Sequence, residues 1–304
     1  MGTDLRSEGR QQLLPVGMVR GRVYPADRGS GAITSLSGAD GFIEILPKTE
    51  FIEAGTPVEV TLFGEVEKPD LLIAGSFCPG IDVLEDLSGL RFRTLYSGSS
   101  GGFSAIAAKT ADIAGVDMPS KPKEKAGTTY NIPTIERMGL SGAVLAKGYR
   151  REVGLLVRQE SLITGLGDLP GKRLINRNRG SGIRELLDMK IEELAGEKGI
   201  SKKEFTNSIS GYSSGAKSEI SVCEAVLSGK ADAGVGLKNC AEKKKGLKFI
   251  KFAEEEYDFL IRKEVLETPE VKKLLQTLFS AEFASKLPSG LQVYERTGEI
   301  IHFE

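Results

Sequence analysis

Three times in this chain, a short apolar run leads through a loop of Gly and Ser residues into a segment with helical spacing of apolar residues. The most informative copy has its loop at residues 176–182, and the segment after it places Leu187, Ile191 and Leu194 on one face. The other two copies have their loops at residues 75–80 and 97–102. Strands that alternate with helices in this way predict an α/β domain with parallel strand pairing.

The loop that leads into the helix after residue 182 has the composition of an anion-binding site. Gly180 and Gly182 let the backbone come close to a bound group, and Ser181 adds a hydroxyl. The free N–H groups at the start of the helix then point toward that group. An anion or a carboxylate is therefore the predicted ligand, and a capped helix start after a glycine turn is the alternative. Three nearby arginines add positive potential or lie on the solvent face: Arg177, Arg179 and Arg184.

Composition excludes several classes of function. Charged residues make up 27% of the 304 residues and the formal net charge is −1, so no basic field predicts nucleic-acid binding. No apolar run is long enough to span a membrane, and the first residues are polar without a secretory apolar core. We therefore expect a cytoplasmic protein that binds neither nucleic acid nor membrane.

Catalytic and metal-binding patterns are also missing from the sequence. The single histidine, His302, would have to serve any Ser-His-Asp triad, Cys-His pair or histidine metal site. The three cysteines, Cys78, Cys223 and Cys240, are too scattered for a zinc site and too few for a disulfide framework. The sequence thus predicts a protein that binds a ligand, with no catalytic residues, no metal site and no tightly bound cofactor.

The first part of the chain has a different texture, with alternating apolar and polar residues interrupted by glycines. This pattern predicts a small all-β module, followed by a charged linker at residues 64–69. The expected strands are residues 15–24, 31–36, 41–46 and 57–63, with turns at residues 27–30 and 37–41. At the other end of the chain we expect a last strand at residues 257–261 and one closing helix at residues 270–285.

Both parts of the chain resemble known domains. Residues 70–304 resemble the type II periplasmic-binding-protein-like domain that is fused to molybdopterin molybdotransferases and is related to LysR effector domains and molybdate-binding transport proteins. The motifs that carry this resemblance lie at residues 73–76, 130–133, 149–155, 176–184, 225–234 and 256–258. Residues 1–66 resemble the C-terminal β domain of molybdopterin molybdotransferases through residues 29–36 and 54–60. Phe77 and Cys78 stand where the family has His-Asp.

The resemblance implies a two-lobed fold with a ligand in the cleft between the lobes. Lobe one would comprise residues 70–148 and 258–304, and lobe two residues 149–257, with crossing strands near residues 144–151 and 257–262. The expected ligand-binding residues are Ser76, Ser97, Ser99 and Ser100 from lobe one, Arg179, Gly180, Ser181, Gly182, Ser213 and Ser214 from lobe two, and the hydroxyl of Tyr257. For Tyr257, packing in the core is an equally good expectation.

The resemblance also implies a function in molybdenum or tungsten cofactor biosynthesis. The expected ligand is molybdate, tungstate or a related small anion, because hydroxyls and N–H groups at helix starts can hold a tetrahedral dianion. A carboxylate or a pterin phosphate is an alternative ligand. An alternative function is one part of a split molybdopterin molybdotransferase, with a partner chain that supplies the catalytic domains, and self-association is left open. Three acidic residues at strand ends are expected to brace loops or pair with arginine: Asp112, Asp117 and Asp232.

Overall fold

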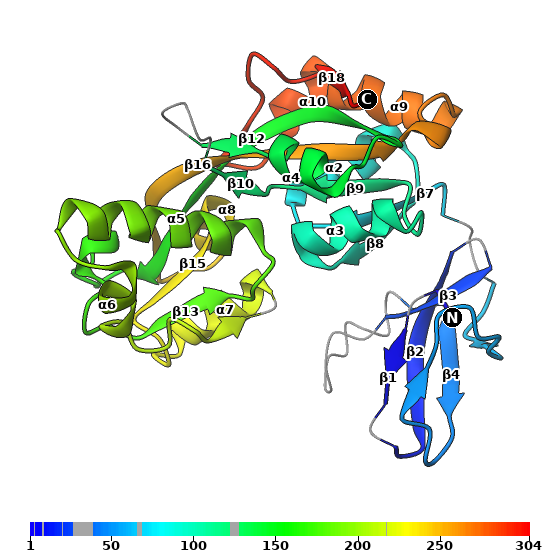
Figure 1. Ribbon diagram of the computed structural model, residues 1–304, viewed down its shortest axis with the longest axis horizontal. Helices are drawn as coiled ribbons and strands as arrows, with labels where there is room; N and C mark the ends of the chain where they lie inside the picture. The colour runs from blue at the N-terminus through cyan, green and yellow to red at the C-terminus, as the bar shows by residue number, and fades with distance from the viewer. Residues whose placement is uncertain are drawn as a thin grey trace. The chain divides into compact units, whose positions relative to one another are not determined.

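The computed structural model describes residues 1–2, 4–7, 9–19, 21–26, 39–65, 69–121, 128–216 and 218–304. These residues divide into two units (Figure 1). Unit 1 comprises Met1–Leu72 with Arg91–Arg93, and unit 2 comprises Ile73–Leu90 with Thr94–Glu304. Within the described ranges, no helix combines the length and the apolar character needed to cross a bilayer.

Unit 1 is a small β module, as predicted. Its core comes from alternating positions: Ile43 and Ile45 point inward with Leu14 and Val16, whereas Glu44 is exposed. Strands β3 (Arg22–Pro25), β2 (Gln12–Val19), β4 (Gly41–Ile45) and β6 (Thr61–Leu62) form one sheet in that order, and β1 (Leu5–Arg6) pairs with β5 (Phe51–Ile52).

Two expected strands of this module were wrong in extent. Residues 15–24 form an antiparallel hairpin instead of one strand, because the chain reverses between β2 and β3 with Gly21 at φ 76°. In the segment 57–63 only Thr61–Leu62 is a strand, although Val58 and Val60 pack against the core. The alternation of apolar and polar residues in this segment therefore reflects burial of one face and not hydrogen bonding to a neighbouring strand. The expected strand at 31–36 and the turn at 27–30 lie outside the described residues, as do residues 37 and 38 of the turn expected at 37–41.

Unit 2 is built on one mixed sheet that extends through two lobes. Among the described residues the strand order is β14-β13-β15-β12-β16-β9-β7-β8, and β17 and β18 also pair with β12. The two longest strands, β12 (Ala143–Arg158) and β16 (Leu247–Arg262), run antiparallel along their whole length. The remaining strands are β7 (Leu71–Gly75), β8 (Phe92–Tyr96), β9 (Ile113–Val116), β13 (Leu174–Arg177), β14 (Gly215–Ala216), β15 (Ala233–Leu237), β17 (Leu291–Gln292) and β18 (Ile300–His302), with a separate pair of β10 (Pro119–Ser120) and β11 (Thr129–Tyr130).

Each end of the long β12–β16 pair carries its own set of strands and helices, and this defines the two lobes. In lobe one β16 pairs with β9, and in lobe two β12 pairs with β15. Helices cover each set (Figure 1). Lobe one has α2 (Pro79–Ser88), α3 (Gly98–Ala107), α4 (Ile132–Met138), α9 (Pro269–Leu278) and α10 (Ala281–Lys286); lobe two has α5 (Gly182–Glu197), α6 (Lys202–Asn207), α7 (Glu219–Leu227) and α8 (Lys238–Glu242).

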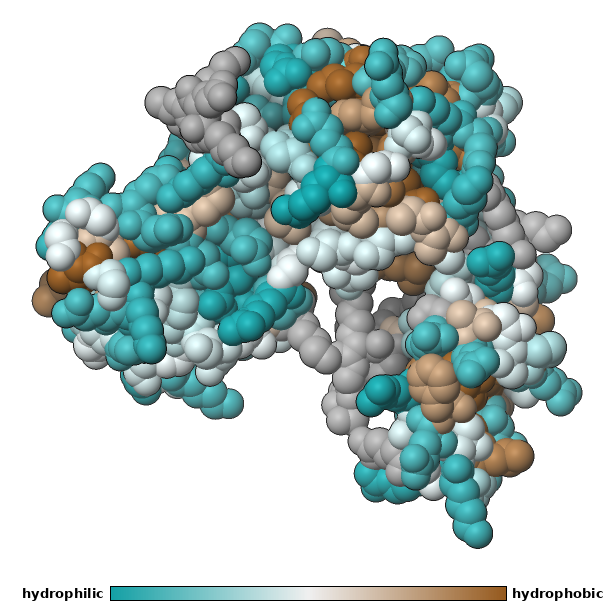
Figure 2. All heavy atoms as spheres, in the orientation of Figure 1, coloured by the Kyte–Doolittle hydropathy of each residue, from teal (hydrophilic) through white to brown (hydrophobic). Residues whose placement is uncertain are grey.

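Alternate side chains of β12 build the core of lobe two on both faces of the sheet. Val153 and Leu155 pack with Ile183 and Leu187 of α5, whereas Leu156 packs on the opposite face with α7. A strand buried on both faces reads as a continuous apolar run, and this explains its sequence. Hydrophilic residues cover most of the lobe-two surface around α5, as Figure 2 shows, so this helix buries only its inner side.

The C-terminal part of unit 2 departs from two expectations. The strand expected at 257–261 belongs to the longer β16 and is not the last, because β17 and β18 follow it. The helix expected at 270–285 is two helices, since α9 ends before Phe279 and the Ser280 hydroxyl accepts a hydrogen bond from the Phe283 N–H at the start of α10. Apolar periodicity continues through this break and therefore conceals it.

Candidate functional site

Except for Tyr257, the residues expected to bind a ligand lie on or beside the loops that follow strands and precede helices. Such positions collect polar side chains and free N–H groups at one edge of an α/β sheet. They are Ser76 after β7; Ser97, Ser99 and Ser100 at the start of α3; Arg179, Gly180, Ser181 and Gly182 between β13 and α5; Ser213 and Ser214 before β14; and Tyr257 within β16.

The Gly and Ser residues at 97–102 form the beginning of a helix and not the expected loop. Helix α3 starts at Gly98, directly after Ser97. A Cβ atom on Gly102 would lie only 3.0 Å from the Cα atom of Gly75, so glycine at this position lets the helix pack closely on β7. The glycines therefore report close packing here, in addition to a turn at Gly98, whose φ is 72°.

The start of α3 and the loop before α5 meet, although about eighty residues separate them in sequence. The Ser100 N–H donates to the Gly180 carbonyl at 3.4 Å. A Cβ atom on Gly98 would lie 3.1 Å from the same carbonyl, and one on Gly180 would lie 3.3 Å from the Ser100 hydroxyl. The structure thus brings together the predicted groups at 97–100 and 179–182, one from each lobe.

Neither helix uses the hydroxyl of its preceding serine as a cap. Ser97 before α3 and Ser181 before α5 make no capping hydrogen bond, although serine at this position usually accepts one from the first turn. The N–H groups of Gly182 and Ile183, at the start of α5, have no acceptor among the described residues. The start of α5 therefore presents N–H donors and a positive dipole end that the described residues leave unused.

Asp117 engages two of the predicted hydroxyls. The Ser76 hydroxyl donates to the Asp117 carboxylate at 2.8 Å, and the Ser99 hydroxyl also donates to it. The Asp117 N–H in turn donates to the Ser99 hydroxyl at 3.0 Å. Asp117 is fully buried, and Gly182 packs directly against it. An internal carboxylate therefore holds Ser76 and Ser99 beside the start of α5.

Arg151 neutralises this carboxylate from β12, one of the two long strands that connect the lobes. Its guanidinium is fully buried and donates to Asp117, to Glu255 on β16 and, at 3.0 Å, to the Phe77 carbonyl. The Tyr257 ring lies 4.5 Å from the guanidinium, and its hydroxyl donates to the Ser76 carbonyl at 2.8 Å. Tyr257 is fully buried, so in this structure it packs in the core and positions Ser76 and Arg151.

Glu255 is the second carboxylate that shares Arg151. Burial raises the pKa of Glu255 to about 8, against the lowering effect of Arg151 and with a further raising effect of Asp117. One of its carboxylate oxygens, Oε2, is buried and has no hydrogen-bond partner among the described residues. Burial therefore favours the neutral acid form of Glu255, and the Arg151 guanidinium favours the ionised form.

The other predicted residues contribute unequally. Arg184 pairs with Asp188 at 3.0 Å and Arg177 with Glu219 at 3.5 Å, whereas Arg179 is exposed and pairs with no described residue. No hydrogen bond within the described ranges joins the side chains of Ser213 or Ser214 to α3 or α5. These two serines lie on the loop beside the end of β13, where the Asn176 N–H donates to the Ser214 carbonyl at 3.1 Å.

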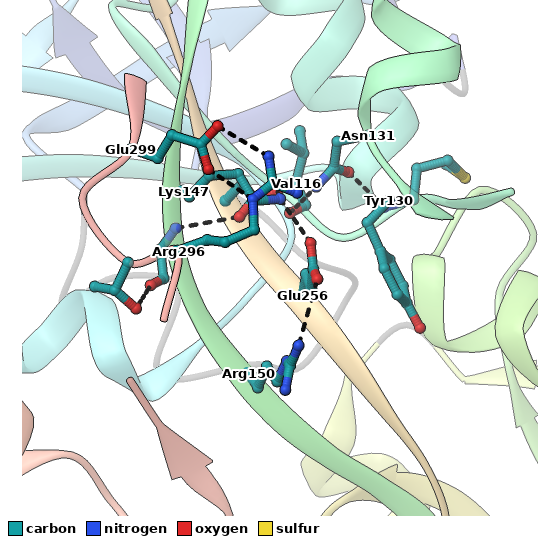
Figure 3. Close-up of polar contacts among 12 residues, drawn as sticks. Val116, Tyr130, Asn131, Lys147, Arg150, Glu256, Arg296 and Glu299 are labelled. Atoms are coloured by element: carbon teal, nitrogen blue, oxygen red, sulfur yellow. Dashed lines mark hydrogen bonds and ion pairs between the residues drawn. The ribbon is translucent and has the colours of Figure 1, made fainter. Parts of the chain in front are cut away.

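A second buried polar cluster fixes the loop after β9 to β12 and β16 (Figure 3). The Lys147 ammonium donates to Asp258 at 2.5 Å and to Glu256 at 2.6 Å. The Asn131 amide also donates to Asp258, at 2.8 Å, and its carbonyl oxygen accepts from the Met118 N–H. Asn131 has φ 64°, so these contacts hold a backbone conformation that most residues avoid. The cluster positions the segment that carries Asp117.

Sequence reasoning missed Arg151, Glu255 and Lys147 as members of the site region, although a signal was present. Lys147 and Arg151 are charged residues inside the largely buried β12, and Glu255 lies just before the buried end of β16; such residues are rarely buried without a partner. The expectation that acidic residues at strand ends pair with arginine is confirmed. Asp112 pairs with Arg262 at 2.9 Å, Asp232 with Arg173 at 2.7 Å, and Asp117 with Arg151.

Comparison with known proteins adds the family. Residues 82–278 match the family model described as the PBP superfamily domain, and residues 1–63 match the MoeA C-terminal region (domain IV). The chain is 32% identical to the uncharacterized protein YvgK of Bacillus subtilis over 180 residues, which are 57% of this chain and 54% of that protein. The match therefore spans about half the length of the Bacillus protein.

Two further similarities cover parts of the chain. Over 96 residues it is 33% identical to an uncharacterized protein encoded in the 5′ region of the ferredoxin 2Fe-2S gene of Clostridium pasteurianum, covering 31% of this chain and 84% of that protein. Among solved structures, the substrate-binding domain of a protein assigned as a molybdenum ABC transporter from Clostridium difficile aligns with a TM-score of 0.50 and 15% identity, covering 74% of this chain and 99% of that one. At this identity the likeness concerns the fold.

Proposed function

Because the chain belongs to the PBP superfamily, we propose that unit 2 binds a small anion between its two lobes. The observation that carries this proposal is the meeting of two helix starts, α3 and α5, at Gly180. Both helices follow a serine whose hydroxyl makes no cap. Two dipole ends at one place, with unused N–H donors at the start of α5, favour a negatively charged ligand.

The contacts of the predicted residues divide them into two roles in this proposal. Ser97, Ser100 and Ser181 supply hydroxyls, the first turn of α5 supplies N–H groups, and the exposed Arg179 supplies a cation. Ser76 and Ser99 already donate to Asp117, so their role in this proposal is to hold that carboxylate in position. Arg151 offsets the charge of Asp117, which would otherwise repel an anion at this place.

We propose molybdate or tungstate as the ligand, in a cytoplasmic role in molybdenum or tungsten cofactor biosynthesis. The match of residues 1–63 to the MoeA C-terminal region supports this context. The shared fold with a domain assigned to a molybdenum transporter is compatible with it. Hydroxyls and N–H groups at helix starts suit a tetrahedral dianion because they supply fixed dipoles.

Thermal unfolding with a panel of molybdate, tungstate, sulfate, phosphate and citrate tests the proposal. A ligand at a hundred times its Kd stabilises the fold by about 2.7 kcal/mol, which moves Tm measurably. We expect such a shift with molybdate or tungstate, and a smaller one in Ser181→Ala. Ser104→Ala is the matched control, since Ser104 lies exposed on α3, away from its start. The absence of a shift with every anion would contradict the proposal.

A second candidate function is one part of a molybdopterin molybdotransferase that acts with a partner chain. The match of residues 1–63 to the MoeA C-terminal region favours it. Copurification from the native source discriminates between the two candidates. A stoichiometric partner that carries the catalytic domains supports the enzyme subunit, and recovery of this chain alone or as a homo-oligomer supports the binding protein.

A further inference from the structure

Three fully buried ionisable side chains form one cluster behind the proposed anion site: Asp117, Arg151 and Glu255. One guanidinium serves two carboxylates, so the cluster has a net charge of −1 when both are ionised and zero when one is protonated. Each charge acts strongly on its surroundings, because water does not screen it at this depth. The protonation state of the cluster therefore sets the electrostatic potential at the neighbouring helix start.

Glu255 is the carboxylate that can take up the proton. Its Oε1 accepts from Arg151, but its buried Oε2 has no partner among the described residues, and an ionised oxygen without a donor is unfavourable there. Asp117, in contrast, accepts hydrogen bonds from Ser76, Ser99 and Arg151. Glu255 interacts electrostatically with Arg151 on β12, Asp117 after β9, Glu219 on α7 and Tyr130 on β11. Burial raises the pKa of Glu255 to about 8.

The cluster lies directly against the start of α5. Gly182, the first residue of that helix, packs on the carbonyl and the carboxylate of Asp117. The Arg151 Nε atom is also buried without a partner among the described residues. With Glu255 protonated, the cluster thus offers two unused donors, Arg151 Nε–H and Glu255 Oε2–H, and no net negative charge.

We propose that Glu255 controls the anion site through its proton, so that the anion binds tightly only when Glu255 is in its acid form. This inference rests on the proposed function, because it concerns the same site. An anion beside the cluster disfavours ionisation of Glu255, and by linkage, binding is accompanied by proton uptake wherever free Glu255 is partly ionised. Affinity is constant below the pKa of Glu255 and falls above it, by up to about tenfold per pH unit.

Isothermal titration calorimetry with tungstate, from about pH 6.5 to about pH 9.5, tests this inference. The charge of tungstate does not change in this range. Repeating each titration in buffers with different ionisation enthalpies gives the number of protons taken up. We expect close to zero protons at the low end and an approach to one proton at the high end, where affinity also falls about tenfold per pH unit.

Two variants locate the proton. In Glu255→Gln we expect the proton uptake to disappear and the affinity to stay level with pH, because glutamine keeps an uncharged donor. Glu256→Gln is the matched control, since Glu256 is the next residue on β16 but bonds to Lys147 outside the cluster, and it should retain the wild-type proton uptake. Should Glu255→Gln fail to fold, the number of protons that the wild-type protein takes up in the buffer series still tests the proposal.

The outcomes separate this inference from the proposed function. Tungstate binding that is level with pH and takes up no proton overturns the role of Glu255 and leaves the anion site standing. Proton uptake that persists unchanged in Glu255→Gln also overturns it. No binding of tungstate or of any anion in the panel, at any pH, overturns both proposals.

Discussion

Gly182 packs so tightly against Asp117 that a Cβ atom on the glycine would collide with both the carbonyl and the carboxylate oxygen of the aspartate. The two residues belong to different lobes, one at the start of α5 and the other after β9. We therefore expect Gly182→Ala to weaken the contact between the lobes. Overpacking of this kind typically destabilises by about 1–3 kcal/mol. Urea unfolding followed by circular dichroism measures the change.

Gly196→Ala is the control for this substitution. Gly196 lies in the same helix, and no atom lies within 4 Å of a Cβ at that position. Alanine is the better helix former by about 1 kcal/mol, so this variant should be as stable as the wild type or more stable. Equal destabilisation in the two variants would mean that the contact with Asp117 carries no energy.

Arg151→Met should be strongly destabilising. The substitution leaves Asp117 and Glu255 buried without their shared cation, and breaking a buried pair from one side typically destabilises by about 3–5 kcal/mol. Arg173→Met is the control, because Arg173 pairs with Asp232 but is about half exposed. An exposed pair contributes about 0–1 kcal/mol. Similar unfolding free energies for the two variants would contradict the described burial of Arg151.

Glu255→Gln should change how stability depends on pH. In the wild type the pKa of Glu255 is raised to about 8 in the folded state, whereas an unfolded glutamate has an ordinary pKa of about 4.3. Between these values the unfolded chain releases the proton and the folded protein keeps it. The free energy of unfolding must therefore fall as pH rises through this window, by up to about 1.4 kcal/mol per pH unit from this group.

The difference between wild type and Glu255→Gln isolates that contribution, because groups outside the cluster of Asp117, Arg151 and Glu255 titrate equally in both. Wild type should lose stability relative to the variant from about pH 4.3 to about pH 8, and the difference should be level on either side. Chemical unfolding at several pH values gives the curve. A difference that is level throughout would show that Glu255 ionises normally in the folded protein.

Lys147→Met tests the second buried cluster. Lys147 and Asp258 are both fully buried, so loss of the ammonium leaves a carboxylate with only the Asn131 amide and the Gly148 N–H as donors. We expect destabilisation of about 3–5 kcal/mol. In the double variant with Asp258→Asn, the total should be smaller than the sum of the single effects. Lys109→Met, at the exposed pair with Glu264, should change stability by less than about 1 kcal/mol.

Much of the fold was readable from local patterns. The alternation in β4 and the strand–loop–helix order around β7 and α2, and around β13 and α5, follow from the side-chain periods of strand and helix. Local patterns could not reveal the length of β12 and β16, because Lys147 and Arg151 interrupt the apolar run with charges whose partners lie over thirty residues away. In the sequence, a charged residue inside a strand therefore resembles the end of that strand.

The hydrogen-bond donors of the site could be predicted from the sequence, but its buried acceptor, Asp117, could not. Gly and Ser before a helix indicate N–H groups and hydroxyls near a ligand, and the structure does bring residues 97–100 and 179–182 together. That Asp117 takes the hydroxyls of Ser76 and Ser99 depends on how β9 lies beside β7, which is a tertiary relation. Whether those serines also contact a ligand stays a prediction.

The last two strands of unit 2 have a consequence for how the domain is made. β17 and β18 pair with β12 at Arg150–Arg151 and at Val144–Ala146, and between them the Thr297 hydroxyl donates to the Gly148 carbonyl at 2.7 Å. During synthesis these residues leave the ribosome after all the remaining strands of the sheet. A nascent chain therefore exposes the edge of β12 until synthesis has passed His302, and during that interval the unfinished sheet is open to pairing with another chain.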